Sequence, residues 1–237
     1  MRKSVVEPKI IFQDNYILVL DKPAGMVVNR DKTVKGKTIQ DWLMANGEWR
    51  MAKSRLYRSG IVHRLDKETS GLLLIAKTKN AFENLQRQFK ERKVKKKYLT
   101  LLRGKLEPKQ GEIVLPISRT RKNREKFGVF PEGKKARTKY KILRYLKKFS
   151  LVEVELLTGR THQIRVHFSF LGYPITADLK YGGKRAKEDR LFCPRMFLHA
   201  FRLGFYHPKN KNFCEFVSPL PSELENAILK ICEKSSS

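Results

Sequence analysis

The chain has 237 residues, and 41% of them are hydrophobic, which is enough for a buried core and excludes the composition of a disordered protein. Its 52 Lys and Arg residues outnumber 23 Asp and Glu residues, and the formal charge of +29 predicts a polyanionic partner, of which nucleic acid fits best. The charge alone separates neither RNA from DNA nor an enzyme from a passive binding protein.

The N-terminal part of the chain is predicted to alternate short strands with helices. Residues 10–20 hold two apolar runs around an Asp-Asn turn, which predicts a hairpin. Thr38 is predicted to cap a helix with one apolar face, and the continuously apolar residues 71–76 predict a strand buried on both faces. The next helix is predicted to begin at Asn80, with Glu83 as its capping-box partner.

Strands dominate the remainder of the chain. They are predicted at residues 98–102, 111–116, 138–145, 151–157, 198–205 and 212–217. The segment Ser118–Arg137 holds eight Lys or Arg residues and two acidic ones, which predicts a long basic loop or hairpin. Ser222 is predicted to cap a final helix, with Glu225 as its capping-box partner.

These elements predict an α+β fold, in which one domain holds a central mixed, mostly antiparallel sheet flanked by helices and loops. Because no repeat and no linker divides the chain, we expect an N-terminal extension at residues 1–9, one domain at 10–232 and a disordered tail at 233–237. The sequence shows no signal peptide and no run of about 18 apolar residues that a membrane span needs, so we expect a cytoplasmic protein.

The segment Gly60–Lys77 carries the strongest candidate for chemistry. Asp66 follows a strand-like start and precedes a Thr-Ser-Gly turn that leads into the buried strand. A carboxylate at such a strand end, with His63 and Arg64 nearby, suits a nucleophile or an acid–base group. By spacing alone, Asp66 fits equally well as a residue that only caps the turn.

Other catalytic patterns do not fit the sequence. In the kinase catalytic loop an Asn follows five residues after the Asp, whereas here position 71 is Gly; a P-loop would need a glycine where Asp31 stands. His162 and His167 lack the glutamate of a zinc-protease helix, and the three cysteines are far apart. We therefore expect no metal site and no disulfide framework.

Five motifs in order carry a resemblance to a known family. In chain order they are Lys22-Pro23-Ala24-Gly25, His63-Arg64-Leu65-Asp66 with Thr69-Ser70-Gly71, Lys96-Lys97-Tyr98-Leu99, the run from Thr158 to His167 continued by Leu171 to Ile175, and Leu198-His199-Ala200 with His207-Pro208. Together they resemble the RluA family of pseudouridine synthases, from about Ile10 to about Leu224. The motif around Asp66 looks like the family's signature motif, Lys96-Lys97-Tyr98-Leu99 resembles its second motif, and the run from Thr158 looks like its third motif.

The resemblance implies roles for individual residues. Asp66 is implied to be the catalytic nucleophile, Tyr98 to stack on the target uracil, and Arg165 to pair with Asp66. Substrate-binding roles are predicted for Arg64, which would fill the stack that the flipped uridine leaves, for Ile164, which would pack against the base, and for His63, Arg160, Thr161 and His162.

Each role has a structural alternative. Tyr98 could be core packing in a strand, and Arg165 an exposed strand arginine that contacts phosphate. His63, His162, His167 and His199 also suit a hydrogen-bonded scaffold, and Gly159 and Gly172 are predicted to serve backbone geometry.

The resemblance thus implies an isomerase that converts uridine to pseudouridine in ribosomal or transfer RNA, without a cofactor, and we expect a monomer. Because the motif pattern starts by Ile10, we expect RNA affinity to come from the catalytic domain rather than from the S4-like domain that many relatives carry. Two other classes stay open. A non-catalytic RNA-binding or ribosome-assembly protein would not need Asp66, Tyr98 and Arg165 together, and a nuclease would need clustered carboxylates, which the sequence lacks.

Overall fold

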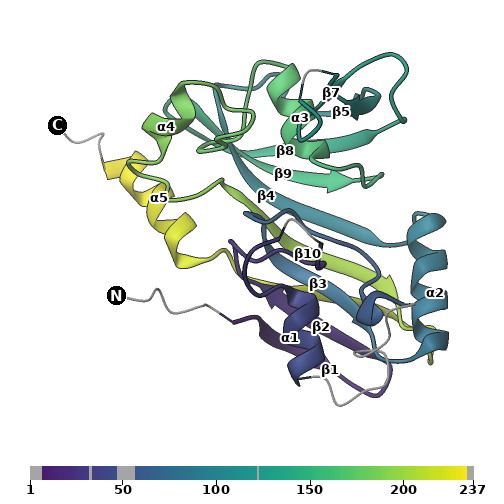
Figure 1. The fold of residues 1–237 in the computed structure, drawn as a ribbon. Coiled ribbons are helices and arrows are strands. Elements are labelled where there is room, and N and C mark those ends of the chain that lie inside the picture. The colour runs from purple at the N-terminus through teal and green to yellow at the C-terminus, as the bar shows by residue number, and fades with distance from the viewer. Residues whose placement is uncertain (1–6, 32–33, 47–56, 122, 234–237) are drawn as a thin grey trace. The chain divides into compact units, whose positions relative to one another are not determined.

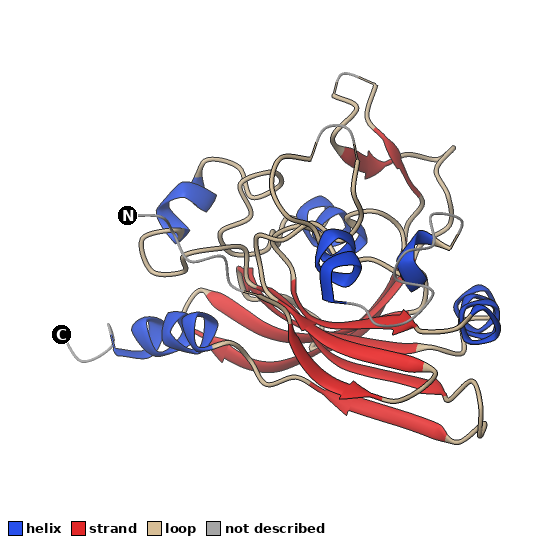
Figure 2. Ribbon diagram, turned by 60° about the horizontal axis from the view of Figure 1, so that its bottom comes forward, coloured by secondary structure: helices blue, strands red, loops and turns tan. Residues whose placement is uncertain are grey.

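The computed structural model describes residues 7–31, 34–46, 57–121 and 123–233 (Figure 1). Its strands are β1 (Lys9–Gln13), β2 (Ile17–Lys22), β3 (Ser70–Ala76), β4 (Lys95–Arg103), β5 (Gln110–Val114), β6 (Ile117–Arg119), β7 (Phe127–Val129), β8 (Arg137–Leu146), β9 (Phe149–Leu156), β10 (Leu198–Tyr206) and β11 (Phe213–Val217). Its helices are α1 (Ile39–Asn46), the 3₁₀ turn η2 (Arg58–Gly60), α2 (Lys79–Lys90), α3 (Gln163–Phe170), α4 (Arg185–Asp189) and α5 (Ser222–Glu233). Helices and strands both contribute substantially (Figure 2), which confirms the α+β class.

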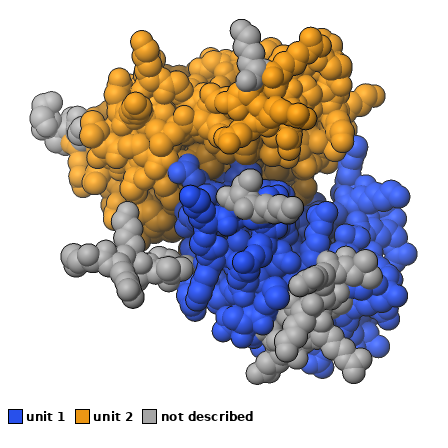
Figure 3. Space-filling view, in the orientation of Figure 1, with its two compact units in different colours: residues 1–95, 202–218 blue, residues 96–201, 219–237 orange. Residues whose placement is uncertain are grey.

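The chain forms two compact units (Figure 3). Unit 1 comprises residues 1–95 and 202–218, and unit 2 comprises residues 96–201 and 219–237. The chain passes between the units inside β4 and inside β10, so two of the crossings lie within strands and not in a linker of the kind that sequence composition reveals.

In unit 1, β1, β2 and β3 pair in that order, and the unit-1 part of β10 pairs with β11, all antiparallel. Strand β3 is buried along its whole length, as its continuous apolar run predicts. Helix α2 packs against β3 and closes one hydrophobic core. That core is formed by Ile17, Val19, Leu72, Leu74, Phe82, Leu85, Leu203 and Phe205 together with neighbouring side chains.

In unit 2, strands β4, β9, β8 and β5 form an antiparallel series, and β6 and β7 form a separate hairpin. The hairpin confirms one of the two predicted conformations of the basic segment Ser118–Arg137. Helix α3 contacts both β8 and β7, so it connects the sheet of this unit to the hairpin.

The helix starts show one correct and two wrong predictions. The Thr38 hydroxyl accepts the Asp41 N–H at 3.1 Å and caps α1 as predicted. Helix α2 begins one residue earlier than predicted, because the Thr78 hydroxyl, not Asn80, accepts the Ala81 N–H at 3.2 Å. Helix α5 begins at Ser222, so Ser222 is the first residue of the helix and not the capping residue that precedes it.

The ends of the predicted domain also differ in detail. Lys9 belongs to β1, and Glu233 is the last residue of α5. Residues 1–6 and 234–237, which make up most of the predicted extension and tail, lie outside the described residues.

Candidate active site

The predicted site residues fall in both units: His63, Arg64 and Asp66 in unit 1, and Tyr98, Arg160, Thr161, His162, Ile164 and Arg165 in unit 2. In unit 1, Asp66 is half-buried in a turn that the Thr69 N–H closes on the Asp66 carbonyl at 3.1 Å. Asp66 therefore does cap this turn through its main chain.

The early Lys-Pro-Ala-Gly motif, Lys22 to Gly25, donates hydrogen bonds to the turn that contains Asp66. Lys22 has no solvent exposure, and its ammonium donates to the carbonyls of Pro23 at 2.8 Å, Met26 at 2.8 Å and Lys67 at 3.2 Å. The Gly25 N–H donates to the same Lys67 carbonyl at 2.8 Å, and Gly25 has φ +90°. A buried ammonium is costly without such partners. Lys22 therefore ties its own motif, Lys22 to Gly25, to the turn that contains Asp66.

Two residues of the same motif, His63 and Arg64, lie in different surroundings. His63 accepts the Leu74 N–H through Nε2 at 2.9 Å and stacks on Phe89, with ring centroids 4.9 Å apart. These contacts give His63 a scaffold role and fix the motif to β3 and α2. Arg64, in contrast, is exposed.

In unit 2, Tyr98 lies on β4 opposite Val154 of β9 and is 7% exposed. Lys96, two residues earlier, projects from the same face of the strand. Burial lowers the pKa of the Lys96 ammonium to about 8. A β-carbon added to Gly159 would lie 3.7 Å from the Lys96 Nζ, so the second and third motifs meet here.

Much of the third motif is scaffold that fixes α3 to β8. The Gln163 amide donates to the Arg137 carbonyl and to the Thr138 hydroxyl, and its oxygen accepts from Thr158 and from the Arg160 N–H, all at 2.8–2.9 Å. His167 is fully buried between the Thr138 hydroxyl and the Leu115 carbonyl. The prediction of a scaffold role for His167 is confirmed.

Arg165 lies on the same helix, not in a strand, and is only 7% exposed. Its Nε and Nη2 donate to the two carboxylate oxygens of Asp178 at 2.8 Å each, and Asp178 has no exposure. The guanidinium carbon lies 4.9 Å from the centre of the Tyr181 ring. The alternative of an exposed strand arginine is therefore wrong, because the helix buries this side chain and gives it a charged partner.

The turn into α3 holds the remaining predicted residues. Ile164 is buried at 3% exposure, Thr161 is exposed, and the Arg160 Nε donates to the Lys135 carbonyl at 3.1 Å. His162 has φ +56°, which a residue with a β-carbon rarely adopts, and its Nδ1 lies 2.8 Å from the Tyr181 hydroxyl.

The two predicted backbone glycines differ. Gly172 has φ +84° and confirms its assignment. Gly159 does not have a positive φ, whereas His162, three residues later in the third motif, does.

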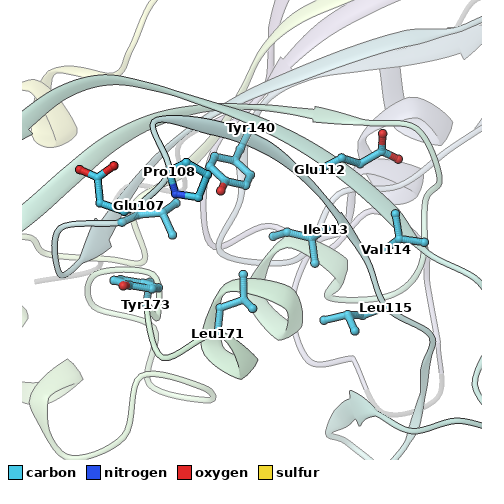
Figure 4. Close-up of a pocket in the computed structure, with 10 residues that line it drawn as sticks. Glu107, Pro108, Glu112, Ile113, Val114, Leu115, Tyr140, Leu171 and Tyr173 are labelled. Carbon is cyan, nitrogen blue, oxygen red and sulfur yellow. The ribbon is translucent and has the colours of Figure 1, made fainter.

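Unit 2 also holds a pocket of about 390 Å³ that contains none of the predicted site residues (Figure 4). Apolar side chains such as Ile113 and Leu171 line it together with Tyr140, Glu107 and Glu112. Both carboxylates are engaged, since Glu107 accepts from the Tyr145 hydroxyl and Glu112 from Arg137, each at 2.5 Å. We assign no ligand to this pocket.

The described residues contain no group of three or more His, Cys, Asp or Glu side chains that could hold a metal ion. Among the same residues, no helix is long and apolar enough to cross a membrane.

Comparison with known proteins identifies the family. Residues 16–170 match the family model described as RNA pseudouridylate synthase. The uncharacterized RNA pseudouridine synthase YlyB of Bacillus subtilis is 39% identical over 219 residues, which cover 92% of this chain and 71% of that protein. The chain belongs to the RluA family of RNA pseudouridine synthases.

Two further relatives extend this result to named ribosomal enzymes and to a solved structure. The ribosomal large subunit pseudouridine synthase D of Nitrosomonas europaea is 40% identical over 222 residues, which cover 91% of this chain and 63% of that protein. The solved structure of human RNA pseudouridylate synthase domain containing 1 matches with a TM-score of 0.74 and 32% identity, over 96% of this chain and 90% of that one. This pseudouridine synthase is therefore an isomerase that acts on RNA.

Three residues of the synthase were not predicted as parts of its site. Lys22 and Asp178 lie within or beside the recognised motifs. Nothing in the sequence shows that Lys22 binds the Lys67 carbonyl or that Asp178 binds Arg165. Tyr181 follows Asp178 by three residues, and only the folded chain brings it to His162 and Arg165.

Proposed function

We propose that this synthase isomerises uridines of ribosomal RNA, with Asp66 as the catalytic nucleophile. The relatives named for the ribosomal large subunit support the choice of RNA. One observation supports the role of Asp66 above the others: its turn is held by a buried ammonium and a glycine N–H that both bind the adjacent Lys67 carbonyl. A carboxylate on such a rigid turn can be aimed at a reacting atom without a large loss of entropy.

The chemistry moves one bond from nitrogen to carbon. With the help of the Asp66 carboxylate, the bond from the ribose C1′ to the uracil N1 breaks. The base rotates while it stays bound, C5 forms the new bond to C1′, and the proton that leaves C5 is balanced by the proton that N1 gains. Atoms and electrons balance without a redox step or an external group donor.

The target uridine must leave the helical stack to reach the catalytic groups. We propose that Arg64, which is exposed, occupies the space that it leaves, and that Tyr98 stacks on the extruded uracil with Ile164 packed beside it. His63, Arg160, Thr161 and His162 complete the proposed substrate-binding set. Arg165 is proposed to pair with Asp66, an interaction that would orient the carboxylate.

RNA binding is proposed to use the β6–β7 hairpin. The described residues of this hairpin include four exposed cations, Arg119, Arg121, Arg124 and Lys126. Arg119 is exposed, and its guanidinium carbon lies 5.4 Å from the Phe127 ring centre, so the ring of β7 helps to hold this cation in place. Such cations bind phosphates independently of base sequence and make affinity depend on salt.

The test is release of tritium from transcripts labelled at uridine C5, because pseudouridine formation expels that hydrogen. Ribosomal and transfer RNA are assayed separately with the wild-type chain, Asp66→Asn and Glu83→Gln. The last variant is a matched control, since Glu83 lies on the exposed face of α2 and makes only a long surface contact of 3.9 Å to Lys79.

The proposal expects release from ribosomal RNA by the wild type and Glu83→Gln, and a loss of at least about a thousandfold for Asp66→Asn, typical for removal of a nucleophile. Release by Asp66→Asn at the wild-type rate would overturn the nucleophile assignment. Release from transfer RNA alone would overturn the substrate. Binding of RNA without release by any variant would favour the assembly-protein alternative.

A further inference from the structure

Tyr181 contacts the β6–β7 hairpin, the turn at His162 and helix α3, all of which belong to unit 2. It follows Asp178 in a loop after α3, and its ring packs against a small core that contains Ile117 of β6 and Val166 of α3. None of the sequence motifs assigns it a role. Its side chain is half-buried.

The hydroxyl joins the hairpin to the start of the helix. It accepts the N–H of Phe127, the first residue of β7, at 3.0 Å, and it lies 2.8 Å from the His162 Nδ1. A tyrosine hydroxyl can accept and donate at the same time, so both bonds can form together. The rings of Phe127 and His162 also meet edge to face, 5.6 Å apart.

This contact addresses a strained position. His162 has φ +56° immediately before the first residue of α3, a left-handed conformation that is unfavourable for a residue with a β-carbon. A second bond from the same loop, from the Ser169 hydroxyl to the Tyr181 carbonyl at 3.0 Å, fixes the loop to the far end of α3.

The ring and main chain of Tyr181 hold Arg165. The guanidinium carbon lies 4.9 Å from the ring centre, and the Tyr181 N–H donates at 3.2 Å to the Asp178 oxygen that also accepts from the Arg165 Nη2. The planar guanidinium is thus bounded by the carboxylate at its edge and by an aromatic ring on its face, an arrangement that leaves it little freedom.

We infer that Tyr181 is a positioning residue with two separable parts: its ring orients Arg165 for the reaction, and its hydroxyl holds the β6–β7 hairpin and His162 to helix α3 for RNA binding. The inference rests on the proposed function, because it gives Arg165 a part in the chemistry and the hairpin a part in binding. It adds a residue that touches neither the phosphates nor the uracil in that proposal and acts through its neighbours.

The experiment separates the two parts by substitution. Tyr181→Phe keeps the ring and removes the hydroxyl, whereas Tyr181→Leu removes both. Tyr145→Phe is the matched control, since its hydroxyl also makes two bonds, to the Leu106 carbonyl at 2.8 Å and to Glu107, in the same unit. Tritium release under single-turnover conditions gives the rate constant at saturating RNA and the RNA concentration for half-maximal rate.

We expect Tyr181→Phe to raise the half-maximal RNA concentration roughly tenfold while the rate constant stays within about threefold, the pattern of lost binding. Tyr181→Leu is expected to lower the rate constant roughly thirtyfold in addition. Tyr145→Phe is expected to leave both parameters within about twofold of the wild type. A residue with only a structural role would lower the melting temperature without this split between the two parameters.

Hydrogen exchange provides a readout that does not depend on activity. The amide of Phe127 is expected to exchange faster in Tyr181→Phe than in the wild type, because it loses the hydroxyl that accepts its hydrogen bond. This comparison can be made even if Tyr181→Leu fails to fold. Kinetic parameters and Phe127 exchange that match Tyr145→Phe would overturn the inference while leaving the proposed function intact. An inactive wild type would instead refute the proposed function itself.

Discussion

Arg165 and Asp178 form a two-point ion pair in which the carboxylate has no solvent exposure and the arginine has 7%. The same carboxylate accepts the N–H groups of Lys180 and Tyr181. Asp178 therefore serves as the centre of the loop that follows α3, and it sets the direction in which the guanidinium extends.

Asp178→Asn is expected to destabilise the fold by about 3–5 kcal/mol, because Arg165 would remain buried beside a neutral amide. Urea unfolding measures the change. Glu215→Gln, which removes the partner of Arg202 in an exposed pair, is the control and should cost at most about 1 kcal/mol. Equal losses in the two variants would show that the buried pair adds nothing to stability.

Lys22→Met should destabilise unit 1 by about 3 kcal/mol, because three carbonyls lose a charged donor. Two of these bonds, to Pro23 and Met26, hold the segment that begins at Lys22. Tritium release should fall as well, since the Lys67 carbonyl beside Asp66 loses the ammonium and keeps the weaker, uncharged Gly25 N–H. The exposed Lys37→Met is the control for loss of one positive charge. If both substitutions behave alike, the buried ammonium does not support the Asp66 turn.

His167 predicts a pH dependence of stability. Burial lowers the pKa of His167 below the usual value of about 6.5, so the folded state favours the neutral ring. The contribution of this ring to stability is therefore complete above pH 6.5 and is lost as the pH falls through the lowered pKa, with a slope of at most about 1.4 kcal/mol per pH unit.

The free energy of unfolding, measured for the wild type and His167→Gln from pH 8 to pH 5, checks this. The difference between the two proteins should be constant above pH 7 and shrink toward acid pH. A difference that grows as the pH falls would mean that the folded chain stabilises the charged ring.

Thr78→Ala should destabilise α2 by about 1 kcal/mol, because the first turn loses the hydroxyl that accepts the Ala81 N–H. Asn80→Ala should change stability by less than about 0.5 kcal/mol, since Asn80 lies inside the exposed first turn. Thermal unfolding of the two variants distinguishes the caps. The reverse order would restore Asn80 as the start of the helix.

The sequence predicted most elements of the fold because their signals are local. Strand β3 carries a continuous apolar run, β9 alternates, and Thr38 caps α1 with its own hydroxyl. Helix α3 was missed, and its burial explains why. Six of its eight residues are buried, and three of these six are polar. The apolar residues Ile164, Val166, Phe168 and Phe170 fall at every second position and show no helical period.

The candidate site divides in the same way. The motifs located Asp66, Tyr98 and Arg165 through resemblance, whereas their supports are long-range contacts that no local pattern encodes. Lys22 reaches the Lys67 carbonyl across 45 positions, and the Tyr181 hydroxyl meets the Phe127 N–H across 54. Sequence periodicity reports which faces are apolar, and it carries no information about which distant polar atoms become partners.

The division of unit 1 into two distant stretches of chain affects how the protein can be made. Leu203 and Phe205 complete the core around Leu72, Leu74 and Phe82, but a ribosome adds them only after nearly all of unit 2 has been synthesised. Until then the apolar side chains of the first stretch lack part of their cover, and such surfaces promote aggregation. The nascent chain therefore carries an unfinished core while residues 96–201 are added, and unit 1 can close only near the end of translation.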